Sequence, residues 1–341
     1  MIDLKTRYLG LDLASPLVAS ASPLTKQLDG FRRLEDGGAS AIVMHSLYEE
    51  EIEYDQLAHD HFLEYGTESF AEALDFVPFP QTSPGPESYL ELLASAKKAV
   101  DVPIIASLNG DTPGGWTRYA RMLEEAGADA LELNIFFLAS DPSMTGSDIE
   151  DQAVGILRDV RELVAIPVAV KMSTFYSSIA NMSDRLANAG ADGLLLFNRF
   201  YQPDVDLEEF EVLPRLTLST PESARIAVRW IGLLYRVVQA DLALTSGVHN
   251  AHEALKGIAA GATVTMMTSE ILKNGTHRFG EIERDMITWL EEHEYDSVAQ
   301  LRGALSRSGV RDEAAFTRAN YKATLDAWRP DTTAIDPVGR R

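Results

Sequence analysis

A repeated order of hydrophobic and polar segments organises this chain. A helix-like stretch ends in Gly-Ala, a short apolar run follows, and the run stops at polar residues. Four copies lead into the apolar runs at 42–44, 131–133, 194–196 and 264–267. Glycine after the last turn of a helix is a usual C-cap, and a short continuous apolar run is typical of a strand buried on both faces. The pattern therefore predicts helices that alternate with buried parallel strands.

Four further apolar runs complete the pattern, and each also ends in polar residues. They occupy residues 16–19, 103–106, 167–170 and 241–244. Eight strands alternating with helices predict an α/β fold, and eight is the number that closes a (β/α)8 TIM barrel. A doubly wound sheet is the competing interpretation. It is disfavoured because no Gly-x-Gly-x-x-Gly sequence follows a strand.

Three segments fall outside the repeat. Long stretches follow the second and sixth predicted strands, at 47–85 and 199–222, and such loops at the catalytic face of a barrel commonly form a lid or a substrate wall. Beyond residue 280, Ile282, Met286, Trp289 and Leu290 recur at helical spacing. We therefore expect a barrel over residues 1–280 and a C-terminal helical extension over 281–330 that packs on it.

Composition narrows the classes of function. The net charge of −22 argues against a nucleic-acid partner, which requires a basic face, and against an anionic membrane surface. The absence of cysteine excludes disulfides, cysteine-ligated metal clusters and a thiol catalyst within this chain. The N-terminus lacks the apolar core of a signal peptide, and no run approaches 18 apolar residues. We expect a cytoplasmic protein without a metal site or a membrane segment.

Polar residues at the strand ends are the candidates for chemistry, because barrel active sites form there. Lys171 directly follows a buried apolar run, where an ammonium group must be paired or must face an anionic ligand. Asn134 and Asn198 end the fourth and sixth strands, either facing the site or capping a loop. Arg199 could bind a substrate carboxylate or form a surface ion pair.

The turns after the seventh and eighth strands have the character of a phosphate site. Each turn lies at the start of a predicted helix, and the two turns are Ser246-Gly247-Val248 and Thr268-Ser269. Barrels often bind phosphate at such positions, on the backbone N–H groups of the helix N-terminus. Two ordinary capped helices are the alternative. A lysine across the barrel mouth from a phosphate could form a Schiff base, or it could stay charged beside a flavin and stabilise the reduced ring. The residues alone leave both chemistries open.

Taken in order, these motifs resemble those of the soluble dihydroorotate dehydrogenases over about residues 1–275. The resemblance implies FMN as cofactor, hydride transfer with a small anionic substrate such as dihydroorotate, and a homodimer. It also implies that Asn134 and Asn198 bind substrate. The positions matching flavin contacts of the family are Ser20, Ala21, Ser22, His45, Ser46, Asn134, Lys171, Asn198, Ser246, Gly247, Val248, Thr268 and Ser269.

The chain departs from the family at the catalytic base. The family uses a Cys or Ser in an Asn-x-Ser-Cys-Pro-Asn-like loop, and a four-residue insertion after Asn134 would align Ser140-Asp141-Pro142-Ser143 with it. Asp141 is then the candidate general base, with Ser140 as the alternative, unless Asp141-Pro142 only starts a turn. His45-Ser46 also replaces the usual Lys-Ser pair.

Two other functions remain open from the sequence. One is a lysine Schiff-base lyase or aldolase on the same barrel, and the other is a non-catalytic flavin-binding partner subunit. Because the chain has no cysteine for an iron–sulfur relay, a redox role requires an external electron acceptor or a partner subunit.

Overall fold

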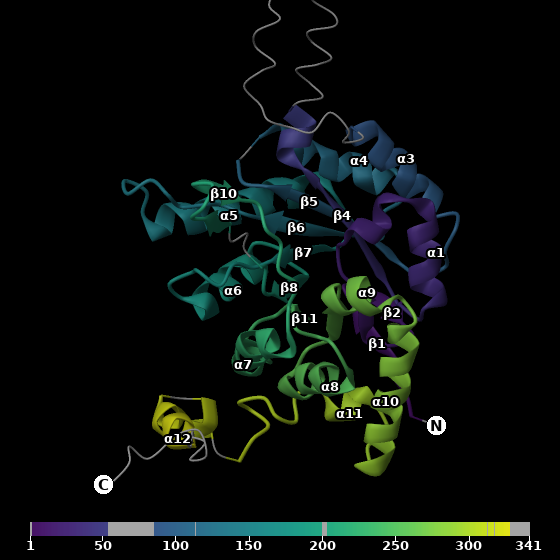
Figure 1. Cartoon of the computed structure of the whole chain (residues 1–341), viewed down its shortest axis with the longest axis vertical. Coiled ribbons are helices and arrows are strands. Elements are labelled where there is room, and N and C mark those ends of the chain that lie inside the picture. Colours follow the sequence, from purple (N-terminus) through teal and green to yellow (C-terminus); the bar gives the residue numbers. More distant parts are fainter. Residues whose placement is uncertain are drawn as a thin grey trace, which may run out of the picture.

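Eight parallel strands close into a barrel in the computed structural model (Figure 1). The structure describes residues 2–53, 85–112, 114–199, 203–311, 313–316 and 318–327. The barrel strands are β3 (Leu17–Ala19), β4 (Ile42–Tyr48), β5 (Ile104–Gly110), β6 (Ala130–Ile135), β7 (Val168–Lys171), β8 (Gly193–Leu196), β11 (Asp241–Thr245) and β12 (Val264–Met267). Each contains one of the predicted apolar runs or most of it. The predicted TIM barrel is confirmed, and the doubly wound alternative is excluded.

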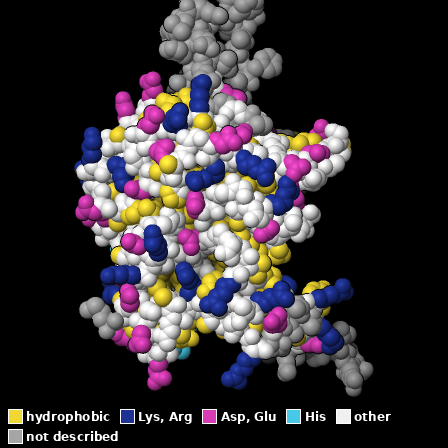
Figure 2. All heavy atoms as spheres, turned by 180° about the vertical axis from the view of Figure 1, so that it is seen from behind, with side chains coloured by type: hydrophobic (Ala, Val, Ile, Leu, Met, Phe, Trp, Pro, Cys, Tyr) yellow, Lys and Arg dark blue, Asp and Glu magenta, His cyan; other side chains and the backbone are white. Residues whose placement is uncertain are grey.

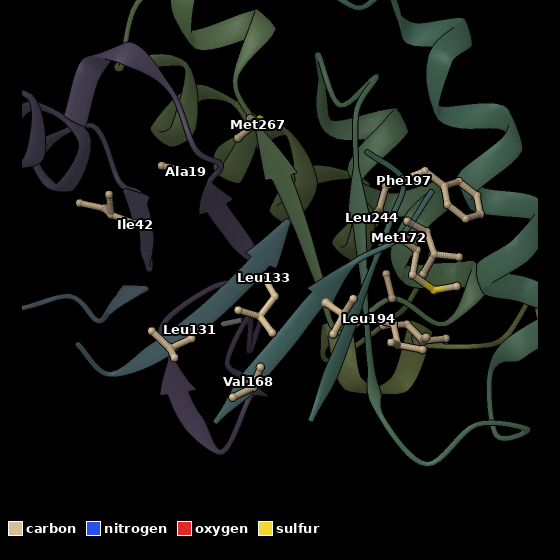
Figure 3. Packing of buried hydrophobic residues seen from close by; sticks show 14 of the residues in the cluster. Ala19, Ile42, Leu131, Leu133, Val168, Met172, Leu194, Phe197, Leu244 and Met267 are labelled. Atoms are coloured by element: carbon tan, nitrogen blue, oxygen red, sulfur yellow. The ribbon is translucent and has the colours of Figure 1, made fainter. Parts of the chain in front are cut away.

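A layer of helices surrounds the strands, as Figure 1 shows. These helices are α1 (Leu28–Asp36), α3 (Pro86–Ala96), α4 (Tyr119–Glu125), α5 (Gly146–Leu163), α6 (Ile179–Asn188), α7 (Ala224–Leu234), α8 (Ala251–Ala260) and α9 (Ser269–Asn274). Alternate strand residues point outward and pack against them; Figure 3 shows Leu131 and Leu133 on one side of β6, and Met172, Leu194, Phe197 and Leu244 close together. Burial of each large aliphatic side chain contributes roughly 1.5–3 kcal/mol.

The remaining strand residues point into the barrel, where an N-terminal hairpin closes one end. Strands β1 (Thr6–Tyr8) and β2 (Leu11–Leu13) pair antiparallel. Tyr8, Leu9 and Leu13 share a second buried cluster with Val18 and other inward-facing strand residues. The Leu9 N–H donates to Asp241 Oδ2 over 2.8 Å, at the first residue of β11. The hairpin therefore covers the N-terminal ends of the strands, and a ligand reaches the interior from the C-terminal ends.

The chain beyond the barrel forms α10 (Arg278–Glu292), α11 (Val298–Leu301) and α12 (Ala319–Ala327). Helix α10 contacts α8 and α9, and it buries Phe279, Ile282, Met286 and Leu290. The predicted packing surface thus lies in the main hydrophobic cluster. The boundary at residue 280 stays a prediction, and residues 328–330 lie outside the described part.

Smaller elements complete the description. Strands β9 (Asp204–Asp206) and β10 (Glu211–Leu213) form a hairpin within the predicted loop 199–222, and short 3-10 helices span Pro23–Lys26, Gly115–Arg118, Pro221–Ser223 and Glu313–Phe316. Most of the predicted loop 47–85 lies outside the described residues. On the face shown in Figure 2, acidic and basic side chains are interspersed. Within the described ranges, no helix is both long and apolar enough to cross a membrane.

Candidate active site

The C-terminal ends of seven barrel strands or the loops after them line a cavity of about 480 Å³. This volume is in the range of small-molecule sites. We call it the mouth cavity. Among the predicted site residues, those lining it are Ser20, Ala21, Ser46, Asn134, Lys171, Asn198, Arg199, Ser246, Gly247, Val248, Thr268 and Ser269. A larger hollow of about 740 Å³ lies beside the β1–β2 hairpin, at the N-terminal end of the barrel and away from these residues.

Lys171, the last residue of β7, is paired inside the barrel. Its Nζ lies 3.3 Å from Oε1 of Glu132 on β6, and only 12% of the lysine side chain is exposed. Glu132 is 1% exposed, and its second oxygen, Oε2, has no hydrogen-bond partner. Lys171 is therefore paired, which is one of the two alternatives expected of it, and it also lines the mouth cavity. Glu132 was not among the predicted site residues, although a charged residue between Leu131 and Leu133 in a buried strand could have indicated it.

The two predicted substrate asparagines lie side by side. Asn198 Nδ2 donates to Asn134 Oδ1 over 2.7 Å, which joins the end of β6 to the loop after β8. Asn134 is almost fully buried. A primary amide carries both donors and acceptors, which is the chemistry needed to orient a ring that bears carbonyl and N–H groups. Arg199 is exposed and lines the same cavity.

The turn after β11 is the candidate anion site. Ser246 and Gly247 have consecutive positive φ angles of 76° and 79°. A Cβ at Gly247 would stand 2.3 Å from the Ala224 backbone nitrogen, so only glycine fits there. Ser246 Oγ is buried without a hydrogen-bond partner. A phosphate would supply the missing partner, and the residues present therefore fit the phosphate of FMN.

Ser22 and His45 occupy an adjoining cavity of about 400 Å³, which shares Ala21 and Ser46 with the mouth cavity. His45 Nδ1 lies 3.1 Å from the Thr25 carbonyl oxygen. Burial lowers the pKa of His45, and the nearby Lys26 charge lowers it further. The imidazole is therefore neutral near pH 7 and does not supply the positive charge that the family's lysine has at this position.

Ser140 and Asp141 lie outside both cavities. Both residues are exposed, and Asp141 Oδ1 accepts hydrogen bonds from Ser143 N over 2.8 Å and from Ser143 Oγ over 2.7 Å. These bonds lower the pKa of Asp141. The preceding residues 137–139 instead line an apolar cavity of about 270 Å³ with Phe175 and Tyr176. The structure does not bring either candidate base to Lys171, and their roles stay predictions.

A comparison with known families identifies the chain. A family model described as dihydroorotate dehydrogenase matches residues 79–290. The chain belongs to the dihydroorotate dehydrogenase family. It is an FMN-dependent oxidoreductase of the class that acts on CH–CH groups, and the lyase and the non-catalytic binder are not favoured.

Three relatives of the chain share a modest fraction of its residues. A dihydroorotate dehydrogenase B (NAD(+)) catalytic subunit of Thermoplasma volcanium is 26% identical over 89% of this chain and 98% of the relative. One from Geobacter sp. strain M21 is 30% identical over 65% of this chain and 74% of the relative. A putative dihydroorotate dehydrogenase A (fumarate) of Aeropyrum pernix is 28% identical over 66% and 75%. The names of the first two relatives specify NAD(+), and the name of the third specifies fumarate.

Proposed function

We propose that this chain transfers a hydride between FMN, bound in the mouth cavity, and a small anionic substrate, with dihydroorotate as the first candidate. One observation carries the proposal: a single cavity joins Lys171, the Asn134–Asn198 pair and the glycine turn that fits a phosphate. The names of the relatives support dihydroorotate over other substrates.

Each part of the cavity has a separate task in this proposal. Ser246, Gly247, Val248, Thr268 and Ser269 bind the phosphate through backbone N–H and hydroxyl groups. The loop Ser20-Ala21-Ser22 lies against the flavin, with Ser46 and His45 beside it. Bound FMN supplies the hydride-accepting chemistry.

The positive charge of Lys171 stabilises negative charge that develops in the cavity. Asn134 and Asn198 orient the substrate, and Arg199 at the rim pairs with a carboxylate.

Asp141 or Ser140 is the general base that takes the proton from the substrate. The segment 136–144 would have to turn toward Lys171, and loops over barrel sites commonly move in this way. Ser143 lies in the same segment, so its hydrogen bonds to Asp141 would move with it; they lower the pKa of Asp141 and keep the carboxylate ionised, the form that accepts a proton. Asp141→Asn and Ser140→Ala separate the two, because only loss of the true base slows anaerobic flavin reduction without weakening FMN binding.

Electrons leave the chain to an external acceptor or to a partner subunit. The relatives described as catalytic subunits support a partner subunit, and the absence of cysteine leaves this chain without an iron–sulfur relay of its own. A second copy of the chain, forming a homodimer, is compatible with the same arrangement. Size measurement of the protein alone and with candidate reductase subunits tests both associations; a monomer under every condition would contradict them.

The visible spectrum of the purified protein, before and after anaerobic addition of dihydroorotate, tests the function. Flavin absorption that bleaches supports both cofactor and substrate. Flavin absorption that persists supports FMN as the cofactor and rejects dihydroorotate as the substrate. If no flavin binds even after reconstitution with FMN, the proposal is wrong.

A further inference from the structure

Four polar side chains form a connected row behind the phosphate turns. His249 Nε2 lies 3.0 Å from Ser219 Oγ, and His249 Nδ1 lies 3.1 Å from Glu270 Oε2. Arg278 Nε donates to Glu270 Oε1 over 2.6 Å. These residues come from the loop before α7, the turn after β11, the first turn of α9 and the start of α10. We call this row the Ser219–Arg278 network.

Ser219 connects the network to both predicted phosphate turns. Its hydroxyl oxygen accepts a long hydrogen bond of 3.4 Å from the Gly247 N–H, and its own backbone N–H donates to Ser269 Oγ over 3.0 Å. All three residues line the mouth cavity, and Ser219 is 8% exposed. Because Ser269 Oγ accepts from Ser219, its hydroxyl proton can be directed at a ligand.

The charged end of the network sets the direction of these hydrogen bonds. Burial alone raises the pKa of Glu270, but hydrogen bonds from Asn274, Arg278 and His249, together with the Arg278 charge, outweigh it and lower the pKa. The ionised carboxylate accepts from the N–H on Nδ1 of His249. In a neutral ring Nε2 is then the acceptor for the Ser219 hydroxyl proton. With this tautomer, each member of the row satisfies the hydrogen-bonding group of its neighbour.

We propose that Ser219, His249 and Glu270 are positioning residues for the phosphate of FMN. They hold the turn at Gly247 and the Ser269 hydroxyl in place before the ligand binds, so that binding costs little conformational entropy. The inference rests on the proposed FMN site and adds residues that the sequence motifs did not include. The network acts on the phosphate, not on the flavin ring.

Comparison of FMN with riboflavin, which lacks the phosphate, tests this role. Dissociation constants would be measured from flavin fluorescence with the apoprotein of the wild type, Ser219→Ala, His249→Gln and Glu270→Gln. We expect FMN binding to weaken about 10-fold or more, the loss that one hydrogen bond to a charged group produces, and riboflavin binding to change less than about 2-fold. Ser219→Thr, which keeps the hydroxyl, should recover part of the FMN affinity.

The matched control is Ser183→Ala, because Ser183 is also buried but donates within α6 to the Ile179 carbonyl. It should leave both flavin affinities unchanged. Inorganic phosphate alone should compete with FMN for the wild type and compete less well for Ser219→Ala, which gives a second measurement if riboflavin binds weakly. Equal losses for the two flavins, or unchanged FMN affinity, would overturn the inference. A wild-type protein that binds neither flavin would instead reject the proposed function.

Discussion

At the scale of single residues, the buried ion pair is the main chemical feature. Lys171 carries a buried positive charge at the mouth cavity, and Glu132 on the neighbouring strand offsets that charge at 3.3 Å. A buried pair of this kind is weak evidence for stability, because removing both charges from water costs several kcal/mol per ion. Its more direct consequence is electrostatic: Glu132 limits how strongly Lys171 favours negative charge in the site.

Glu132→Gln should therefore raise the midpoint potential of bound FMN. The substitution keeps the side-chain shape and leaves the Lys171 charge without its partner, which favours the more negative reduced state. A change on the order of 1–2 kcal/mol, or about 20–40 mV for two electrons, is expected from Coulomb's law at an effective dielectric near 20. Spectroelectrochemical titration measures it.

Glu292→Gln, at an exposed position on α10, is the control and should leave the potential unchanged. An unchanged or lowered potential in Glu132→Gln would contradict the electrostatic role of the pair.

At the scale of elements, the N-terminal hairpin determines which end of the barrel is open. The β1–β2 hairpin fills the interior beside the first residues of the strands. A side chain at Gly193, the first residue of β8, would displace Leu9 of the hairpin, because a Cβ there would stand 2.7 Å from Leu9 Cδ2. The element is therefore part of the core despite its short strands.

Leu13→Ala should destabilise the barrel without altering the mouth cavity. Leu13 is 3% exposed within the interior cluster, and truncation of a buried leucine typically lowers the free energy of unfolding by about 2–5 kcal/mol. Chemical denaturation measures this loss, and FMN affinity at low temperature should stay near that of the wild type. Leu305→Ala, at an exposed position, should cost less than about 0.5 kcal/mol. Comparable losses of unfolding free energy in the two variants would show that the hairpin is not part of the core.

At the scale of the whole molecule, Glu270 and Arg278 link the barrel to the C-terminal helices. Glu270 lies at the start of α9, and Arg278 begins α10, whose apolar face belongs to the main core. Glu270 thus contacts both the turn after β11, through His249, and the start of α10, through Arg278.

The stability provided by Glu270 should depend on pH. Its folded-state pKa is lowered, so its contribution is fully present above the unfolded pKa of about 4.3 and is lost as pH falls through the folded value. The difference in Tm between wild type and Glu270→Gln should therefore be constant from about pH 7 to pH 5.5 and should narrow at lower pH. Calorimetry across this range measures it. A difference that did not vary with pH would argue against a paired, ionised Glu270.

Much of the candidate site was predictable because a parallel barrel places the C-terminal ends of all its strands at one face. Lys171, Asn134, Asn198 and the turn at Gly247 were identified from polar residues that stop apolar runs, and they line one cavity. Glu132 and the Ser219–Arg278 network were not identified. Their partners are distant in the chain, and no local pattern shows which side chains will face each other.

The sequence by itself determined the alternation of strands and helices, the closure of the barrel and the family, because these follow from local hydrophobic periodicity and from ordered motifs. Only the tertiary structure decided that Glu132 pairs with Lys171, that Asn134 contacts Asn198, and that Asp141 lies outside the cavity. The physical reason is that such contacts depend on which way each side chain points once the barrel has closed. A one-dimensional pattern specifies the spacing of residues along an element, while long-range packing specifies their neighbours.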